Sequence, residues 1–253
     1  MSIVIDRKEV AQVPVLEVFS QDSLGKRPLV VLIHGWGGRK EDMLTIAYHL
    51  AVGQLFVVSI DAVGHGERTL NEPWTLSSIL TILDGTATDV MRVAEAYAGH
   101  PLADSTRLGV SGLSMGGIVT FQVVTNGKSK PKAAVPMIAT PDLLSLRHAR
   151  NSAHIFEMLG IAPETFLQNG TLQVLQQMQP ASRVEQMVGL PVLMLNGADD
   201  SLIPIEDVRA FYEKTRALYP DAEAFQLIEH PGVGHFVSAE MEEEALRWFR
   251  QYL

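Results

Sequence analysis

The stretch that decides the fold is residues 108–121, which read LGVSGLSMGGIVTF. It places a Gly-x-Ser-x-Gly pattern, Gly112 to Gly116, between an apolar run typical of a buried strand and a run of helical composition. A serine on a strained turn between strand and helix needs neighbours without side chains, because both backbones pass close by. Its hydroxyl projects above the sheet, where the helix N-terminus offers positive potential to a developing oxyanion. The segment therefore predicts Ser114 as a nucleophile.

A serine nucleophile requires a base, and the base requires a group that fixes its tautomer. The loop 196–204, NGADDSLIP, follows a predicted strand and carries two carboxylates. The loop 230–236, HPGVGHF, follows the next predicted strand and carries two imidazoles. Serine, acid and histidine thus appear in that order along the chain, each just past the end of a strand.

Each of these two loops offers two candidates. Asp199 and Asp200 are adjacent and cannot both face the histidine, so we predict Asp200 as the acid and Asp199 as a turn or capping carboxylate. His230 ends a strand directly before a proline, whereas His235 lies in a glycine-containing loop before the last helix, so His235 is the predicted base. The remaining six histidines are predicted to be structural: His34, His49, His65, His100, His148 and His154.

Acyl transfer also requires backbone N–H donors directed at the tetrahedral oxygen. Met115 directly follows the serine, and its amide is the first predicted donor. The loop 34–38, HGWGG, follows an earlier predicted strand, and its glycines let the backbone turn its amides toward the serine. Trp36 is the predicted second donor of this oxyanion hole, with Gly37 as the alternative.

Short β-branched runs alternate with stretches of helical period, which predicts an α/β fold with a mostly parallel sheet covered by helices on both faces. The opening segment, Ile3–Phe19, has no room for a crossover helix and predicts an antiparallel pair of strands at the sheet edge. The predicted strands are Val13–Val18, Leu29–Ile33, Leu55–Ile60, Leu108–Ser111, Ala133–Ile138, Val192–Leu195 and Ala224–Ile228. Helices are predicted near residues 40–52, 75–98, 115–126, 205–218 and 238–251.

The strand and helix alternation lapses at about residues 140–189, where prolines punctuate apolar residues of helical spacing. We predict a helical insertion within a single domain of 253 residues, either a lid (cap) over a site or an enlarged crossover packed on the sheet. A lid would line an apolar acyl pocket, although a buried helix face has the same composition. The predicted substrate-binding residues are Phe156, Met158, Leu159, Phe166, Leu172, Leu175 and Met178.

Composition excludes several classes of function. The 20 basic and 29 acidic residues give a net charge of −9, which repels a phosphate backbone, so nucleic acid is not an expected partner. The absence of cysteine excludes disulfides, Cys-ligated zinc, Fe–S clusters and a thiol nucleophile. Charged residues near the N-terminus and apolar runs far shorter than the roughly 20 residues of a membrane span predict a cytoplasmic protein without membrane contact. No metal or nucleotide motif is present, and no cofactor is expected.

With these motifs the chain resembles the α/β-hydrolase superfamily, in particular the small bacterial carboxylesterases related to the prolyl oligopeptidase and dienelactone hydrolase branch. The resemblance implies an eight-stranded, mostly parallel sheet with an antiparallel second strand and a metal-free serine hydrolase site. It also implies that loop 61–68 shapes one wall of the site, with Arg68 as an alternative ligand for a substrate carboxylate. A serine at the elbow argues against dehalogenases, epoxide hydrolases and true dienelactone hydrolases. The residues that carry the resemblance are His34 to Gly38, Asp61 to Arg68, Gly112 to Gly116, Asp200 with Ile203-Pro204, and Gly234-His235-Phe236.

We therefore expect a serine hydrolase that cleaves small-molecule carboxylic esters of short to medium acyl chain through an acyl-enzyme. An acylpeptide or small-peptide amidase, or a C–C bond hydrolase, would use the same residues, and the sequence does not separate them. A non-catalytic ligand-binding protein on the same fold is a third hypothesis. It is the weakest, because such a protein has no reason to keep serine, acid and base together.

Overall fold

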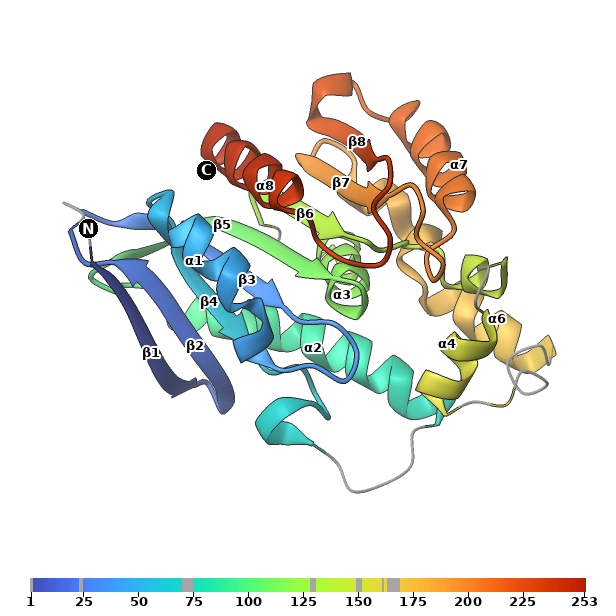
Figure 1. Cartoon of the computed structure of the whole chain (residues 1–253), viewed down its shortest axis with the longest axis horizontal. Helices are drawn as coiled ribbons and strands as arrows, with labels where there is room; N and C mark the ends of the chain where they lie inside the picture. Colours follow the sequence, from blue (N-terminus) through green and yellow to red (C-terminus); the bar gives the residue numbers. More distant parts are fainter. Residues whose placement is uncertain are drawn as a thin grey trace.

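The sheet has eight strands, of which β2 alone runs against the others (Figure 1). The computed structural model describes residues 2–22, 25–69, 75–127, 131–148, 152–160, 162 and 169–253. The strand order β1-β2-β4-β3-β5-β6-β7-β8 confirms the predicted fold class, including the antiparallel opening pair. The strands are β1 (Ile3–Val10), β2 (Val13–Ser20), β3 (Arg27–Ile33), β4 (Phe56–Ile60), β5 (Ala103–Leu113), β6 (Ala133–Met137), β7 (Val192–Gly197) and β8 (Phe225–His230).

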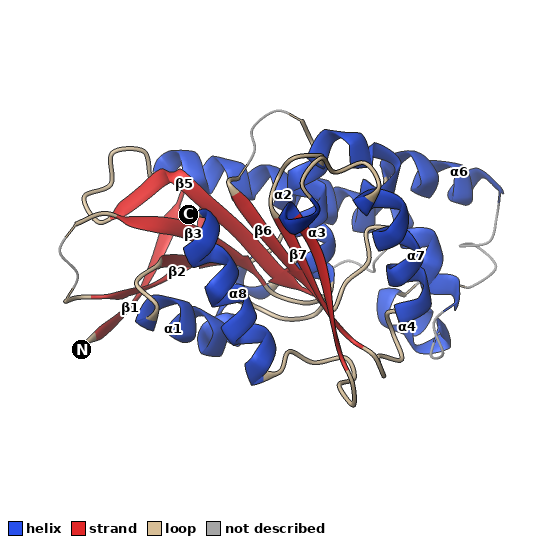
Figure 2. Ribbon diagram, turned by 90° about the horizontal axis from the view of Figure 1, so that it is seen from above, coloured by secondary structure: helices blue, strands red, loops and turns tan. Residues whose placement is uncertain are grey.

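Helices cover both faces of the sheet (Figure 2). Successive residues of the central strand β3 belong to opposite clusters of the core: Val31 packs with one cluster, and Val30 and Leu32 pack with the other. One face is covered by α2 (Leu76–Ala96), α3 (Met115–Thr125) and α7 (Ile205–Arg216), and the other by α1 (Leu44–Val52) and α8 (Ala239–Tyr252). Short 3-10 turns complete the path: η1 (Lys40–Met43), η2 (Gly66–Arg68), η3 (Leu143–His148), η4 (Pro180–Met187) and η5 (Ala222–Ala224).

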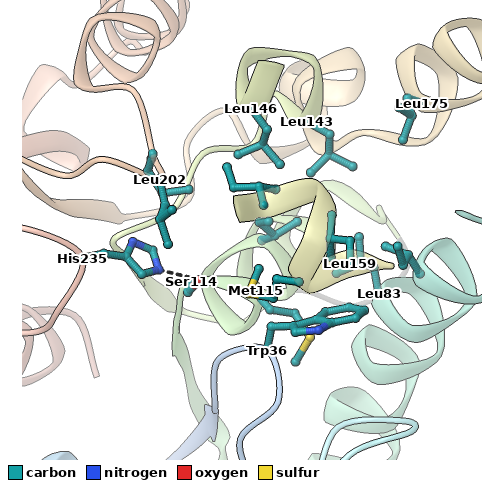
Figure 3. Close-up of a pocket in the computed structure, with 15 residues that line it drawn as sticks. Trp36, Leu83, Ser114, Met115, Leu143, Leu146, Leu159, Leu175, Leu202 and His235 are labelled. Carbon is teal, nitrogen blue, oxygen red and sulfur yellow. Dashed lines mark hydrogen bonds between the residues drawn. The ribbon is translucent and has the colours of Figure 1, made fainter. Parts of the chain in front are cut away.

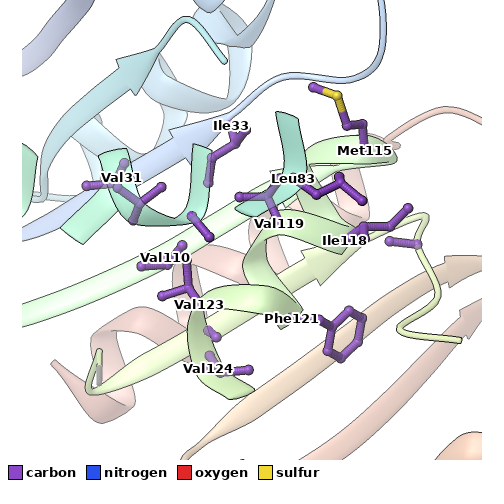
Figure 4. Packing of buried hydrophobic residues seen from close by; sticks show 14 of the residues in the cluster. Val31, Ile33, Leu83, Val110, Met115, Ile118, Val119, Phe121, Val123 and Val124 are labelled. Atoms are coloured by element: carbon purple, nitrogen blue, oxygen red, sulfur yellow. The ribbon is translucent and has the colours of Figure 1, made fainter. Parts of the chain in front are cut away.

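Helix α3 is buried along its whole length, and its apolar residues form the centre of one core cluster (Figure 4). Its threonines add no unsatisfied hydroxyl to this core. The Oγ1 of Thr120 donates to the Gly116 carbonyl oxygen at 2.9 Å, and the Oγ1 of Thr125 donates to the Phe121 carbonyl oxygen at 2.9 Å. A helix that is apolar on every side is held by contacts in all directions, which fixes its N-terminus relative to the sheet.

Between β6 and β7 the described residues form η3, α4 (Ser152–Leu159), α6 (Asn169–Met178) and η4, and they include no strand. This agrees with the helical pattern of residues 140–189, and its role as a lid remains a prediction. No helix in the described part of the chain combines the length and the apolar character that a membrane span requires.

A buried ionic cluster ties the chain after β3 to the chain after β4. Lys40 is fully buried, and its Nζ donates to Asp61 Oδ2 at 3.0 Å and to the carboxylate of Glu67. Burial lowers the pKa of Lys40, but the hydrogen bonds to Glu67, Asp61 and Glu41 outweigh it and raise this pKa above its usual value. Asp61 Oδ1 also accepts from the Lys40 backbone amide at 2.8 Å, so the cluster fixes main chain as well as side chains.

Removing the ammonium of this cluster should destabilise the protein. We expect Lys40→Met to lower the free energy of unfolding by about 3 kcal/mol, because the buried Asp61 carboxylate loses its counter-charge. The control is Arg39→Met, which removes an exposed guanidinium from the neighbouring position and should cost less than about 1 kcal/mol. Urea denaturation measures both, and equal effects of the two substitutions would contradict a structural role for the cluster.

Candidate active site

Ser114 lies on the turn from β5 into α3 and has an unusual backbone conformation. Its φ of 54° and ψ of −115° are strained for a residue with a side chain. A Cβ atom added to Gly116 would lie 2.1 Å from the Ile33 carbonyl oxygen, and one added to Gly112 would lie 2.5 Å from the Gly116 carbonyl. Both glycines are therefore required by close backbone approach, as the sequence predicted.

Three side chains from three loops form a continuous chain of hydrogen bonds. His235 Nε2 lies 2.9 Å from Ser114 Oγ (Figure 3), and His235 Nδ1 lies 2.7 Å from Asp200 Oδ2. An ionised carboxylate only accepts, so the Nδ1–H donates to Asp200 and leaves Nε2 to accept from the serine hydroxyl. This is the tautomer that a general base for Ser114 requires.

The backbone around Asp200 holds its buried carboxylate in place. Its Oδ1 accepts from the amides of Leu202 at 2.8 Å and Ile203 at 3.0 Å, which leaves Oδ2 for His235. The side chain of Asp200 has no exposed surface. Two backbone donors and one imidazole N–H thus solvate a charge that water does not reach.

The two alternative residues of the acid and histidine loops lie outside this arrangement. Asp199 is exposed, and its backbone amide donates to the Val233 carbonyl oxygen at 3.0 Å, which fits the predicted turn role. His230 faces away to helix α8, where its Nε2 lies 2.9 Å from Glu244 Oε2. The structure brings Asp200 and His235 together with Ser114, and neither alternative takes part.

Arg68 is engaged elsewhere and does not line the cavity at Ser114. Its Nη1 donates to Asp89 Oδ2 at 2.7 Å and to the Asp61 carbonyl oxygen at 3.1 Å. The loop after β4 therefore uses this guanidinium to close its own turn against α2. The alternative role of Arg68 as a ligand for a substrate carboxylate finds no support in this geometry.

Both residues predicted to supply amide donors line the same cavity as Ser114. Met115 is the first residue of α3, where the amide has no partner within the helix. Trp36 follows Gly35, whose backbone packs so closely on the elbow that an added Cβ would lie 3.6 Å from Ser114 Cβ. Trp36 and Met115 both line the cavity that opens at Ser114 (Figure 3).

An apolar cavity extends from Ser114 beneath the helical insertion. Of the predicted substrate-binding residues, Met158, Leu159 and Leu175 line it. Figure 3 shows Leu202 beside His235, and Trp36 and Leu159 on the other side of Ser114. Among the described residues that line the cavity, His235 is the only one with an ionisable side chain, and none is a carboxylate or an ammonium.

Phe156, Leu172 and Met178 were also predicted to line the pocket, but they do not line this cavity. On α4, the residues that do line it are Ile155, Met158 and Leu159, which have the i, i+3, i+4 spacing of one helix face. Phe156 is turned by about 100° from Ile155 around the helix and packs into the core cluster. Leu172 is only partly buried, and Met178 packs on the same core cluster near η4. Phe156, Leu172 and Met178 therefore do not line the cavity at Ser114, and Phe166 lies outside the described residues.

Eight of the 15 residues that line the cavity are not among the predicted catalytic, oxyanion or substrate-binding residues. They belong to α2, α3, η3, α4 and the loop after β7. The sequence carried a signal for two of these regions: η3 and α4 lie in the predicted insertion at 140–189, and Leu202 and Ile203 lie two and three residues after Asp200. The additional lining residues are Ile79, Leu83, Ile118, Leu143, Leu146, Ile155, Leu202 and Ile203.

Polar groups elsewhere do not form a metal site in the described part of the chain. No group of three or more His, Asp or Glu side chains there is arranged to hold a metal ion.

Comparison of the sequence with known proteins identifies the family of this chain. Residues 47–253 match the model of the prolyl oligopeptidase family. "Putative esterase YitV" of Bacillus subtilis (strain 168) is 28% identical, with 99% of this chain and all of that protein aligned. "Esterase YjfP" of Escherichia coli (strain K12) is 26% identical, with the same coverage.

The fold is also that of solved structures. TT1662 from Thermus thermophilus superposes with a TM-score of 0.79 at 24% identity, covering 100% of this chain and 98% of that one. The site lies within a fold that the superfamily shares, and the family match includes the serine, acid and histidine loops. The chain belongs to the prolyl oligopeptidase family of the α/β-hydrolase superfamily and is a serine hydrolase.

Proposed function

We propose that this serine hydrolase cleaves carboxylic esters with an uncharged acyl chain of short to medium length. The observation that carries the proposal is the unbroken chain of hydrogen bonds from Asp200 through His235 to Ser114, at the mouth of an apolar cavity. The names of the two aligned relatives, both called esterases, support the same reaction.

In the proposed mechanism Ser114 Oγ attacks the acyl carbon while His235 Nε2 takes its proton. Asp200 holds the Nδ1–H and stabilises the imidazolium that forms. The amides of Trp36 and Met115 stabilise the tetrahedral oxyanion. The imidazolium then gives its proton to the leaving alcohol, and a water molecule activated by the same histidine hydrolyses the acyl-enzyme.

The lining of the cavity supports an apolar acyl group. Each methylene that leaves water for such a pocket gains about 0.8 kcal/mol, whereas an unpaired charge there would lose its hydration without a partner. The side of the cavity near Trp36 and Leu159 is our proposed acyl side. Leu202, beside His235, then contacts the alcohol that leaves.

The first test identifies the nucleophile before any substrate is known. A fluorophosphonate probe should add once to the intact protein, and peptide mapping should locate the adduct on Ser114. A panel of matched esters, amides and diketones then separates ester cleavage from amidase and C–C hydrolase activity. Faster cleavage of the amides or diketones would overturn the proposed substrate class.

Removing the nucleophile should abolish turnover without affecting folding. We expect Ser114→Ala to reduce ester hydrolysis by about 10⁴-fold or more, because the acyl-enzyme can no longer form. Spectrophotometric assay of a p-nitrophenyl ester measures the rate, and circular dichroism checks the fold. A folded variant that keeps more than about a tenth of the rate would exclude Ser114 from the mechanism.

The two neighbouring aspartates provide a matched pair for the acid. Asp200→Asn should lower kcat by about 10³-fold or more, because an amide favours the wrong tautomer of His235. Asp199→Asn changes an exposed side chain by the same atoms and should leave kcat within about threefold. Steady-state kinetics of both variants decide the assignment, and the opposite ranking would refute it.

Filling the acyl side of the cavity should shorten the preferred acyl chain. Leu159→Trp should reduce kcat/KM for a hexanoate ester about tenfold more than for an acetate ester, since only the longer chain reaches the added ring. Val174→Trp adds the same ring to the exposed face of α6 and serves as the control. If both variants keep the wild-type ratio of hexanoate to acetate, the acyl chain lies elsewhere.

A further inference from the structure

Two buried histidines outside the triad lie beside the proposed oxyanion hole. His34 directly follows β3, and His65 lies in the loop after β4. Both are almost completely buried, and their rings are 5.5 Å apart. The proposed mechanism gives neither of them a chemical step. Their contacts instead converge on Trp36.

The hydrogen bonds of His34 define its tautomer. Its Nε2 lies 3.1 Å from the backbone nitrogen of Ala62, and a backbone amide can only donate, so Nε2 accepts. Its Nδ1 lies 2.7 Å from the Gly35 carbonyl oxygen, which can only accept, so Nδ1 carries the proton. Burial lowers the pKa of His34, which favours the neutral ring that this pair of bonds requires.

The Gly35 carbonyl and the Trp36 N–H belong to one peptide group. The described peptide bonds include no cis form, so this N–H points opposite to that carbonyl. The carbonyl oxygen accepts from His34 Nδ1 and from the Gly38 amide, the latter at 3.1 Å. Fixing the oxygen by two donors on one side of the loop therefore fixes the direction of the Trp36 N–H on the other.

The side chain of Trp36 is held by the second histidine. The His65 ring meets the indole edge to face, with centroids 5.0 Å apart and an interplanar angle of 80°. His65 Nδ1 lies 2.9 Å from the Val63 carbonyl oxygen and donates to it. Burial lowers the pKa of His65 too, which favours a neutral ring against the indole.

We propose that His34 is a positioning residue of the oxyanion hole, which orients the Gly35–Trp36 peptide so that the Trp36 N–H faces the tetrahedral oxygen. The inference rests on the proposed function, since it assigns a device to the same site. It predicts that losing the His34 donor weakens stabilisation of the transition state and leaves binding of the ester substrate unchanged, because the ground-state ester places less charge on that oxygen.

Two amide substitutions separate the two hydrogen bonds of His34. His34→Asn keeps an N–H near the position of Nδ1, whereas His34→Gln keeps an acceptor near Nε2 and loses the donor to Gly35. We expect His34→Gln to lower kcat about 100-fold with KM within about twofold, the loss typical of one oxyanion donor. His34→Asn should recover about tenfold of that loss. Equal kcat for the two variants, or a higher kcat for His34→Gln, would overturn the proposal.

A pair of inhibitors tests whether the loss concerns the oxyanion. Ser114 Oγ adds to the carbonyl carbon of an alkyl trifluoromethyl ketone, and its oxygen becomes a tetrahedral oxyanion. The matching methyl ketone, in contrast, binds as an uncharged carbonyl compound. His34→Gln should weaken the trifluoromethyl ketone by about the same factor as kcat and leave the methyl ketone unchanged. Equal weakening of both inhibitors would mean general damage to the site and would refute the positioning role.

The matched control is His100→Gln. His100 also anchors backbone, since its Nδ1 accepts from the amides of Leu102 at 3.3 Å and Ala103 at 3.2 Å, but it lies at the opposite end of β5 from Ser114. This variant should keep both kcat and the ratio of the two inhibition constants. A change in that ratio equal to the one in His34→Gln would show that any loss of an imidazole that anchors backbone produces the effect, which overturns the proposal.

Wild-type protein supplies a measurement that needs no variant to fold. Imidazole ¹⁵N NMR should show His34 protonated at Nδ1 and not at Nε2, and the opposite tautomer would overturn the inference. The wild type also distinguishes a failure of the proposed function from a failure of the positioning role of His34. If it neither hydrolyses esters nor reacts with the fluorophosphonate, the proposed function falls. If it does both and His34→Gln keeps the wild-type kcat and inhibitor ratio, only the positioning role falls.

Discussion

The carbonyl oxygen of Ile33 lies where a side chain at position 116 would have to be, and this close approach governs the whole site. It lets α3 begin directly over the ends of β3 and β5, with Ser114 held at a positive φ between them. Such strain costs of order 1–3 kcal/mol and persists only where the surroundings outweigh it. The surroundings here are a helix buried on all sides, so the packing of α3 is what keeps the serine exposed above the sheet.

Parallel strand direction explains why loops far apart in sequence meet at this point. The strands β3, β5, β7 and β8 all end at the same edge of the sheet, and the loops after them carry Trp36, Ser114, Asp200 and His235. The cost of this convergence is a buried carboxylate, Asp200. Hydrogen bonds from two backbone amides and from the imidazole N–H of His235 offset that cost. The bond from His235 also fixes the tautomer of its ring.

The sequence could predict the fold and the meeting of Ser114, Asp200 and His235 because both depend on local signals. Strand runs, the glycines of the elbow and the loops after β7 and β8 each lie within a few residues of the group they position. The acyl cavity depends on which face of each helix meets the others, and apolar spacing alone does not orient a helix. Phe156 and Ile155 are neighbours in one apolar stretch, yet only Ile155 lines the cavity. Residues of α2 such as Leu83 gave no signal, since they are remote in sequence from every motif.

The sequence also could not predict the surroundings of His34 and His65, because these depend on contacts between loops that are remote in sequence. Single histidines are more often structural, and both of these are buried and hydrogen-bonded to the backbone. Their place becomes meaningful only through Trp36, whose amide is the proposed oxyanion donor and whose indole is a wall of the cavity. In the proposal, one residue thus carries a chemical role through its backbone and a specificity role through its side chain. A change that shifts the Trp36 backbone moves both the donor and the indole. The oxyanion hole constrains this wall of the cavity, while the walls from α2, α4 and α6 can vary without disturbing the chemistry.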